Sequence, residues 1–372
     1  MGYRQGLCRA LRDLEIPHVV WHDRPLRHPP RDAQVHIAEF GQSRPSCRAA
    51  ASGLHPLGPF SHVIAGVERS VVPASHARRV LKARRSVHTT LMRCHDKLLM
   101  KEQLRAAGVP VTDFMAGRPG NGPEAYSALG PRMVIKERTE SGGRGMQVVE
   151  SLAQAEDATM TGRLAERFVD GAEVSVESFV RNSRVCFTNI TQYVKRKHVN
   201  LLPAELPADL SSALLGVHAQ VVEALRIAWG ITHCEFYLTS DGPVVGEIAL
   251  RPPGGYIMEL LQLAYGFSPW EALVAVELGH AFRFPERASQ TAAALIWHPG
   301  PGRVREIRGL DAVRRHPRVQ RATLKLEIGD PVAVRSGVGE DVGHALLVGP
   351  DADEVRAALR DVESALTIDL DG

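Results

Sequence analysis

The chain has 372 residues, with 45 Lys and Arg against 42 Asp and Glu, and this length predicts two or three packed units. Hydrophobic residues make up 44% and charged residues 23%, which excludes disordered, collagen-like and small disulfide-rich proteins. No apolar run approaches the roughly 20 residues that a membrane-spanning helix needs. The N-terminal stretch contains no signal-peptide core. We therefore expect a globular protein in the cytoplasm.

The five cysteines are scattered and form no CxxC pair, so the sequence indicates neither a disulfide framework nor a structural zinc site. Residues 1–90 carry 14 Lys or Arg against 6 Asp or Glu, a bias that would suit nucleic acid or anionic substrates. However, only 7 of the 45 basic residues are lysine, which is typical of codon bias. Few aromatic residues accompany them for base stacking. We expect no nucleic-acid partner and no membrane partner.

Alternating helix and strand patterns open the chain and predict an α/β segment with a parallel sheet. The expected elements are a helix over residues 3–14 and strands at 18–21, 35–37 and 61–65, with a helix before the last strand. Such a segment normally begins with a strand and a glycine turn. This sequence begins at Gly2, already in the turn, so we expect the first strand to be missing. A long helix over 75–107 should then end at Gly108 and Pro110.

Strand patterns dominate the middle of the chain. The expected strands are 132–136, 146–149, 164–169, 172–180, 185–193, 233–238 and 244–250. The last two flank Ser240-Asp241-Gly242, a strong hairpin signal. The expected helices are 210–229, closed by Gly230, then 255–264 and 269–278. Strands at 292–297, 321–326 and 343–349 with a helix over 352–366 predict a smaller α+β unit at the C-terminal end.

A glycine-rich loop at 141–145 (SGGRG) lies between two expected strands and follows Lys136. Glycines allow backbone N–H groups to approach an anion closely, and a lysine on the preceding strand adds a positive charge for phosphates. The loop matches neither a Walker A sequence nor a GxGxxG motif before a helix. It is a candidate phosphate-binding lid, and an ordinary hairpin loop is the alternative.

Glu235 and Glu247 are equidistant from Asp241, so a symmetric hairpin would make them cross-strand neighbours on one face. Like charges directly opposite each other are destabilising, which predicts a cation between them. Mg²⁺ typically takes one or two carboxylates together with substrate phosphates. The period of a strand places Arg251 on the face of Glu247, where it would stabilise a phosphoryl or acyl-phosphate anion. A solvated, salt-bridged face is the alternative, which the apolar neighbours disfavour.

Two further groups of polar residues are weaker candidates. Glu173 and Glu177 share one face of an expected strand, and Glu173 would accept hydrogen bonds from ribose hydroxyls, although a polar outer face would look the same. The basic run at 195–198 (KRKH) lies in a loop after a strand. It would clamp a substrate carboxylate or phosphate, and a solvated loop fits equally well.

Four motifs, taken in chain order, resemble those of the ATP-grasp superfamily. Within that superfamily they are most similar to the carboxylate–amine ligases of the amino-acid ligase type. They are DK at 96–97 before a helix ending in AAGVPV, MVIKERTESGGRGMQVVE, LAERFVDGAEVSVE and HCEFYLTSDGPVVGEIALRPPGG. They span about residues 96–255. The resemblance implies an α/β (α+β) chain with an ATP-grasp fold. Its implied units are an N-terminal Rossmann-like pre-ATP-grasp domain (1–92), a lid subdomain (93–165), a central catalytic subdomain (166–288) and a C-terminal α+β subdomain (289–372).

The resemblance also implies roles for single residues. Those expected to bind the nucleotide are Lys97, Lys136, Ser141, Gly142, Gly143, Gly145, Met146, Glu166, Arg167, Phe168, Val169 and Glu173. Glu235 and Glu247 match the magnesium ligands. Arg251, with Lys136 and Gly143, is expected to act on the acyl phosphate. Substrate contacts are expected from Lys195, Lys197, His198, Pro253, Gly254 and Gly255.

The activity implied by the resemblance is ATP-dependent joining of a carboxylate to an amine through an acyl phosphate, with amino-acid substrates, ATP and Mg²⁺ or Mn²⁺. Many relatives are dimers, so a homodimer is compatible. Ala249 departs from the family pattern, which has Asn there, and alanine supplies no oxygen for a second magnesium. Three alternatives stay open: a bicarbonate-using carboxylase or carbamoyl-phosphate-type enzyme, a non-catalytic nucleotide-binding protein, and a basic nucleic-acid module.

Overall fold

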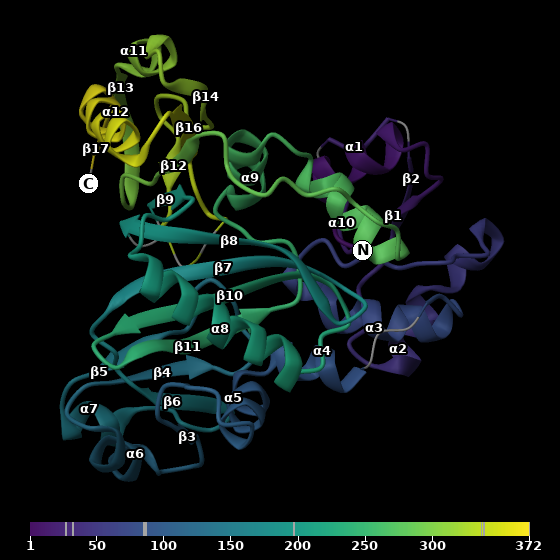
Figure 1. Cartoon of the computed structure of the whole chain (residues 1–372), viewed down its shortest axis with the longest axis horizontal. Helices are drawn as coiled ribbons and strands as arrows, with labels where there is room; N and C mark the ends of the chain where they lie inside the picture. Colours follow the sequence, from purple (N-terminus) through teal and green to yellow (C-terminus); the bar gives the residue numbers. More distant parts are fainter. Residues whose placement is uncertain are drawn as a thin grey trace.

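The computed structural model describes residues 1–26, 28–31, 33–84, 88–195, 198–335, 337 and 339–371. An antiparallel sheet of eight strands runs through the molecule (Figure 1). In spatial order its strands are β11 (Gly242–Ala249), β10 (Trp229–Thr239), β7 (Ala172–Arg181), β8 (Arg184–Lys195), β9 (Val199–Leu202), β12 (Thr291–Trp297), β16 (Gly343–Gly349) and β14 (Val319–Leu324). None of the described helices is long and apolar enough to cross a membrane.

Helices cover both faces of this sheet because the side chains along each strand point alternately to opposite faces, and apolar side chains lie on both. Val174 and Val176 of β7 pack with α4 (His88–His95), α5 (Lys97–Ala106) and α8 (Ala208–Ala224). Phe179 points to the other face, where it packs with α1 (Gln5–Asp13), α9 (Ile257–Tyr265) and α10 (Pro269–Leu278). Near the C-terminus, α12 (Ala352–Ala365) covers β12 and β16. Glu173 and Glu177 therefore lie on the α9 side of the sheet.

A separate four-stranded antiparallel sheet carries the glycine-rich loop. Its order is β3 (Phe114–Ala116), β6 (Arg163–Arg167), β4 (Met133–Glu137) and β5 (Gln147–Val149). Helices α6 (Gly122–Leu129) and α7 (Leu152–Asp157), which the sequence analysis did not predict, cover one face of it through Leu129 and Ala155. Strands β4 and β5 form the expected hairpin, with Ile135 opposite Gln147. This hairpin confirms the strand–loop–strand arrangement.

The N-terminal lobe contains the predicted parallel pair, β1 (Val19–His22) and β2 (Gln34–Ile37), with α2 (Arg44–Ala50), the 3-10 helices η1 (Ser52–Leu57) and η2 (Glu68–Ser70), and α3 (Val71–Val80). The strand predicted at 61–65 is wrong. Among the described residues its backbone makes single contacts with separate partners: Ile64 O accepts from Met1 N (2.6 Å), Ser61 O from Arg84 N (2.8 Å) and Val63 O from Arg78 Nε (2.9 Å). Gly2 N in turn donates to Trp21 O of β1 (2.9 Å). Contacts with separate partners do not form a ladder.

Two predicted helices end differently in the structure. The helix expected over 75–107 is three helices, because Lys82 has a positive φ of 57° after α3 and Asp96 is extended. The Asp96 carboxylate then accepts from Leu98 N (3.0 Å) and caps α5. The helix expected over 210–229 ends at Ala224, since Arg226 has φ +55°. Gly230 lies inside β10 with φ +115° and does not close a helix.

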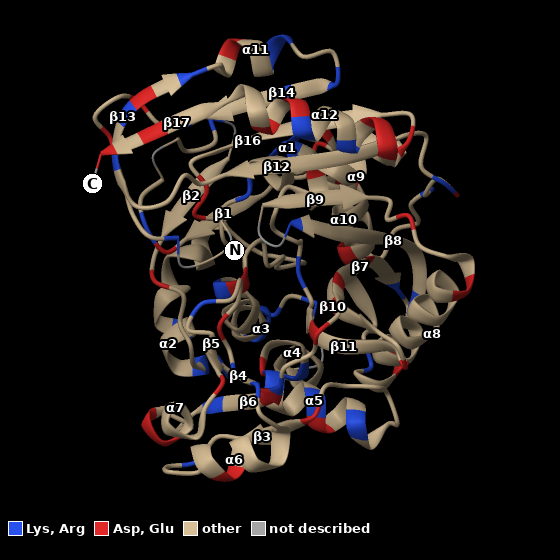
Figure 2. Ribbon diagram, turned by 90° about the vertical axis from the view of Figure 1, so that its left-hand side faces the viewer, with Lys and Arg blue, Asp and Glu red and all other residues tan. Residues whose placement is uncertain are grey.

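The C-terminal part adds a three-stranded antiparallel sheet that was not predicted. Its order is β15 (Pro331–Val332), β13 (Gly302–Arg308) and β17 (Thr367–Asp371), and α11 (Leu310–Arg315) lies beside β14. Figure 2 shows basic and acidic positions interspersed over the face that it displays.

Candidate active site

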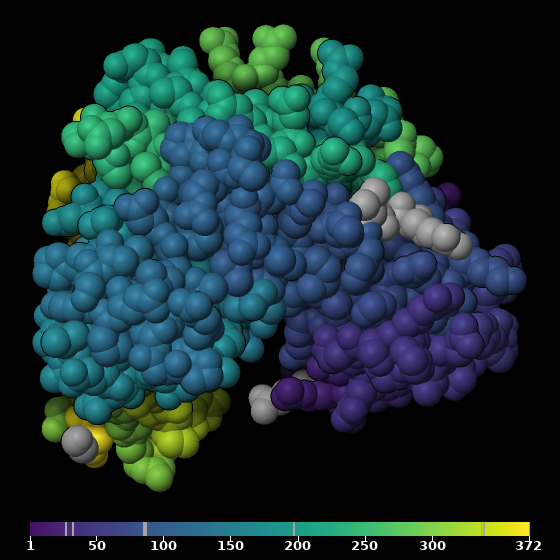
Figure 3. Space-filling model, turned by 90° about the horizontal axis from the view of Figure 1, so that it is seen from below, coloured from purple at the N-terminus to yellow at the C-terminus, as the bar shows by residue number. Residues whose placement is uncertain are grey.

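A cavity of about 680 Å³ lies between the two larger sheets and α1, and the surface is hollowed between the N-terminal lobe and the four-stranded sheet (Figure 3). Most residues singled out from the sequence line this cavity. They are Lys97, Lys136, Ser141, Gly142, Gly143, Met146, Glu173, Glu235, Glu247, Arg251, Gly254 and Gly255. The structure thus brings together segments that lie more than 150 residues apart in the chain.

Other predicted residues lie outside the described lining of the cavity, including Gly145 and the segment 166–169. Lys195 forms an ion pair with Glu363 (2.7 Å), and His198 Nδ1 lies 3.3 Å from Ile296 O. Lys197 lies outside the residues that the structure describes. The carbonyl of Pro253 accepts a hydrogen bond from Arg4 (3.3 Å).

The β10–β11 hairpin presents two opposed carboxylates to the cavity. The turn is Ser240-Asp241, with Thr239 opposite Gly242, and the register shifts by one residue between Glu235 and Phe236. This β-bulge makes Glu247 the cross-strand partner of Glu235. The predicted pairing is therefore confirmed, whereas the symmetric hairpin centred on Asp241 is wrong.

Lys97 lies beside this carboxylate pair. Its ammonium is 3.4 Å from Glu247 Oε1 and donates to the carbonyl of Glu140 in the glycine-rich segment. Burial raises the pKa of Glu247, and the charge of Glu235 raises it further, while Lys97 opposes both. Positive charge at this point therefore stabilises two ionised carboxylates.

The described residues contain no group of three or more His, Cys, Asp or Glu that could hold a metal ion. A hard divalent cation at Glu235 and Glu247 would accordingly take its remaining ligands from water and phosphate oxygens, as Mg²⁺ often does. The opposed carboxylates fit such a cation, because both are oxygen donors and both line the cavity.

A buried network missed by the sequence analysis holds Lys136. Glu166 Oε2 lies 3.1 Å from Lys136 Nζ and 3.5 Å from Lys101 Nζ, and it accepts from Thr112 Oγ1 (3.0 Å). Burial favours the neutral carboxyl, but the two lysines lower the pKa of Glu166 overall. Burial lowers the pKa of Lys101 to about 8. Lys101 follows Lys97 by one helical turn, a spacing that could have identified it.

The glycine-rich loop contains residues in a left-handed backbone conformation. Gly142 and Gly143 have φ angles of +69° and +75°, which a residue with a Cβ rarely adopts. Successive left-handed residues allow backbone N–H groups to surround an anion. Arg144 reaches across to Glu340 (3.5 Å), so the loop contacts the C-terminal part of the chain.

Arg251 is held by an acidic residue from the N-terminal lobe. Its Nε donates to Glu68 Oε2 (2.5 Å), and the other oxygen of Glu68 lies 2.9 Å from His95 Nδ1. Burial alone would raise the pKa of Glu68, but His95 and Arg251 together lower it to about 2. Glu68 lies 183 residues before Arg251. No local pattern in the sequence indicates this pair.

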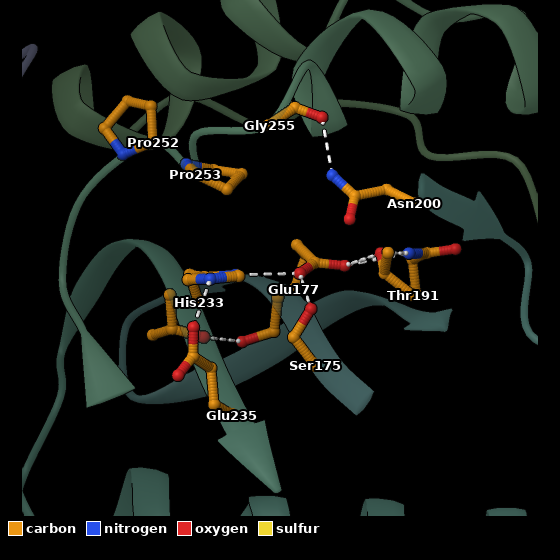
Figure 4. Close-up of polar contacts among 12 residues, drawn as sticks. Ser175, Glu177, Thr191, Asn200, His233, Glu235, Pro252, Pro253 and Gly255 are labelled. Carbon is orange, nitrogen blue, oxygen red and sulfur yellow. Dashed lines mark hydrogen bonds and ion pairs between the residues drawn. The ribbon is translucent and has the colours of Figure 1, made fainter. Parts of the chain in front are cut away.

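A second buried network lies next to Glu235 (Figure 4). Glu177 is completely buried and accepts hydrogen bonds from Ser175 (2.6 Å), Thr191 (2.6 Å) and His233 Nδ1 (2.9 Å). The other imidazole nitrogen of His233 lies 3.5 Å from Glu235 Oε1. Burial disfavours the charged imidazole, but both carboxylates raise the pKa of His233 to about 9. The alternation of residues 233 and 235 on one strand face could have identified His233.

Ala249, which stands where the family pattern has Asn, lies next to this network. Ala249 is the cross-strand partner of His233 and is buried. Beyond it, the Asn200 amide donates to Gly255 O (2.8 Å), as Figure 4 shows. A Cβ on Gly255 would lie 2.4 Å from that amide nitrogen, so a larger residue has no room there.

Comparisons with known protein families identify two domains in the chain. Residues 102–258 match the ATP-grasp domain, and residues 294–371 match the L-amino acid ligase C-terminal domain 2. The crystal structure of an L-amino acid ligase from Bacillus licheniformis superposes with a TM-score of 0.83 at 19% identity, covering 98% of this chain and 95% of that one. An N5-carboxyaminoimidazole ribonucleotide synthetase from Thermotoga maritima gives 0.76 at 19% identity, covering 99% and 97%.

Among curated sequences, an L-arginine-specific L-amino acid ligase from Bacillus subtilis is 25% identical over 242 residues, which cover 60% of this chain and 59% of that protein. Dapdiamide A synthase from Enterobacter agglomerans is 27% identical, with 56% of each chain covered. The chain thus spans about 60% of the length of the first of these relatives. The structural likeness establishes the ATP-grasp fold.

Proposed function

We propose that this chain, which matches the ATP-grasp domain over residues 102–258 and the L-amino acid ligase C-terminal domain 2 over 294–371, joins an amino acid to an amine in an ATP-dependent reaction. The observation that carries the proposal is the arrangement of one cavity: opposed carboxylates Glu235 and Glu247, a glycine-rich loop, and Arg251.

In the first step, a carboxylate oxygen of the acid attacks the γ-phosphorus of ATP. The O–P bond forms as the bond from that phosphorus to the β–γ bridging oxygen breaks, and ADP leaves. Lys97, Lys136 and the backbone of the loop 141–145 would hold the phosphates in line with the carboxylate. Catalysis then rests on positioning and charge neutralisation, and it requires no side-chain nucleophile.

In the second step, the amine nitrogen attacks the carbonyl carbon of the acyl phosphate. The C–N bond forms, the C–O bond to phosphate breaks, and the amine loses a proton. Arg251, fixed by Glu68, would stabilise the charge on the acyl phosphate and on the departing phosphate. Closure of the loop 141–145 would exclude water, which would otherwise hydrolyse the intermediate.

Glu235 and Glu247 would hold Mg²⁺, or Mn²⁺ in its place, and the ion would neutralise phosphate charge during transfer. In this proposal the unit at 93–165 is the lid, the unit at 166–288 carries the metal ligands, and the units at 1–92 and 289–372 complete the substrate pocket.

The test traps the intermediate with hydroxylamine, which converts an acyl phosphate to a hydroxamate without a natural amine. The chain is incubated with ATP, Mg²⁺, hydroxylamine and each of the twenty amino acids in turn, and ADP and hydroxamate are measured. We expect equal amounts of both with a subset of the acids. ADP formation that requires only bicarbonate would favour a carboxylase, and ATP binding without ADP in any mixture would favour a non-catalytic nucleotide-binding protein.

A further inference from the structure

The two opposed carboxylates are only partly packed. The side chain of Glu235 is 35% exposed and that of Glu247 is 27% exposed. Both are long, flexible side chains, and like charges opposite each other on a hairpin repel. Contacts with other side chains must therefore fix the directions of the two carboxylates if both are to face one cation.

The two carboxylates are held by different kinds of neighbour. Lys97 Nζ lies 3.4 Å from Glu247 Oε1, at the end of a long and flexible chain. On the other strand, His233 Nε2 lies 3.5 Å from Glu235 Oε1. His233 and Glu235 alternate on β10, so their side chains share one face of the strand. The neighbour of Glu235 is thus a rigid ring on the same strand.

The imidazole of His233 is anchored through its second nitrogen. His233 and Glu177 are cross-strand partners of β10 and β7, and Nδ1 lies 2.9 Å from Glu177 Oε1. A carboxylate only accepts hydrogen bonds, so Nδ1 carries the proton and donates it. The side chain of His233 is 10% exposed. The ring therefore cannot turn without breaking a buried hydrogen bond (Figure 4).

Glu177 is itself fixed by a network of donors. Its Oε1 also accepts from Ser175 (2.6 Å), and its Oε2 accepts from Thr191 (2.6 Å) and from the amide of Asn189 (2.9 Å). The oxygen of that amide accepts from the hydroxyl of Tyr265 in α9 (3.1 Å). A buried polar network whose members are all hydrogen-bonded is rigid. Both oxygens of Glu177 are engaged, so its carboxylate cannot rotate.

We propose that Glu177 and His233 are positioning residues, which hold the Glu235 carboxylate opposite Glu247 so that the pair is arranged for a divalent cation before the ion arrives. The inference rests on the proposed function, in which Glu235 and Glu247 hold Mg²⁺. Both residues act through Glu235. Partners that orient a metal ligand commonly change metal affinity by about 10- to 100-fold.

Two substitutions separate the contacts of the imidazole. His233→Asn keeps an amide N–H near the position of Nδ1 for Glu177, but its shorter chain does not reach Glu235. His233→Gln extends an amide N–H towards Glu235 without the anchor on Glu177. The control is His218→Asn, which removes a buried histidine from the opposite face of β7, where His218 Nε2 lies 2.9 Å from Ser178 Oγ.

The probe is Mn²⁺, titrated into the full chain with a non-hydrolysable ATP analogue, and free Mn²⁺ is measured by electron paramagnetic resonance. Urea unfolding is measured in parallel. We expect His233→Asn to raise the Kd for Mn²⁺ by about 10- to 100-fold, with an unfolding midpoint no lower than that of His218→Asn. His233→Gln should recover part of the affinity, and His218→Asn should bind Mn²⁺ as wild type does.

An unchanged Kd in His233→Asn, with Mn²⁺ bound by wild type, would overturn the inference. So would an equal rise in His218→Asn, because general loosening of the sheet would then explain the loss. A wild-type chain that binds no Mn²⁺ beside the nucleotide analogue would instead overturn the cation site of the proposed function, and the inference with it.

Discussion

Glu235 lies directly opposite Glu247 across the β10–β11 hairpin, although a regular ladder drawn from the turn would pair Glu235 with Gly246. The bulge leaves Gly246 as the extra residue and turns Glu247 to the cavity side. A symmetric hairpin centred on Asp241 predicts the same pair, because moving the centre to Asp241 and inserting a bulge at Gly246 shift the register at Glu235 by the same amount.

Replacement of either carboxylate tests the cation site. Glu235→Gln and Glu247→Gln remove one negative charge each while keeping the size of the side chain. We expect ADP formation to fall by at least about 100-fold in each variant. The control is Glu223→Gln, an exposed residue of α8. Full activity in both variants, measured at saturating Mg²⁺, would show that the pair holds no essential ion.

Glu68 should act through Arg251. Glu68→Gln weakens the ion pair and leaves the guanidinium free to rotate, so we expect kcat/KM to fall by about 10- to 100-fold. The partner His95 would also lose its charged acceptor. Glu102→Gln, on the exposed side of α5, is the matched control. Because a structural defect would lower stability too, the variant is also unfolded in urea, and an unchanged rate with lower stability would argue against positioning.

The stability of the fold should decrease on acidification through His218. This side chain is fully buried against Ser178 (2.9 Å), and burial lowers the pKa of His218 to about 4, against 6.5 for an exposed histidine. Between these values the unfolded chain binds the extra proton, so stability is complete above pH 6.5 and falls towards pH 4. From pH 7 to pH 5 the loss amounts to about 2 kcal/mol.

The measurement is urea unfolding at pH 7 and pH 5 for wild type, His218→Gln and His55→Gln. Glutamine retains a hydrogen bond for Ser178 but does not titrate, so His218→Gln should lose about 2 kcal/mol less than wild type over this interval. His55 is exposed, and its replacement should leave the loss of stability between pH 7 and pH 5 as it is in wild type. Identical pH dependence in all three proteins would contradict the prediction.

Ala249→Asn would restore the carboxamide of the common family pattern beside Glu247. If that oxygen reaches a second cation, the Mg²⁺ concentration for half-maximal ADP formation should decrease several-fold. Ala249 is buried opposite His233, so size alone could disturb the site. Ala249→Val supplies the bulk without the oxygen, and a similar shift in both variants would exclude coordination as the cause.

Local sequence patterns were sufficient to predict the features that lie within one segment of the chain. The hairpin, the glycine-rich loop with Lys136 and the parallel pair β1–β2 all follow from alternation, glycine content and spacing. Helix ends were less predictable, because a single residue in an unusual conformation, such as Lys82 or Asp96, divides a pattern that is otherwise helical.

Contacts between distant segments could not be derived from one sequence. The pairs Glu68–Arg251 and Lys101–Glu166 join residues 183 and 65 positions apart, and neither partner has a local signal for the other. The strand expected at 61–65 failed for a related reason. Its composition suits a strand, but a ladder needs a neighbouring strand, and the described contacts of this segment are single hydrogen bonds from Met1, Arg78 and Arg84.

The eight-stranded sheet has a mechanical consequence. Its two halves meet at β9, a fully buried strand of four residues that pairs with β8 on one side and β12 on the other. Bending between the halves would break the four residue pairs of the β9–β12 ladder, so the β10–β11 hairpin and the C-terminal strands form one stiff platform. Opening and closing of the site is then left to the four-stranded sheet, which shares no ladder with this platform. Hydrogen exchange should accordingly be slow and uniform from β10 to β16, and faster in β4 and β5.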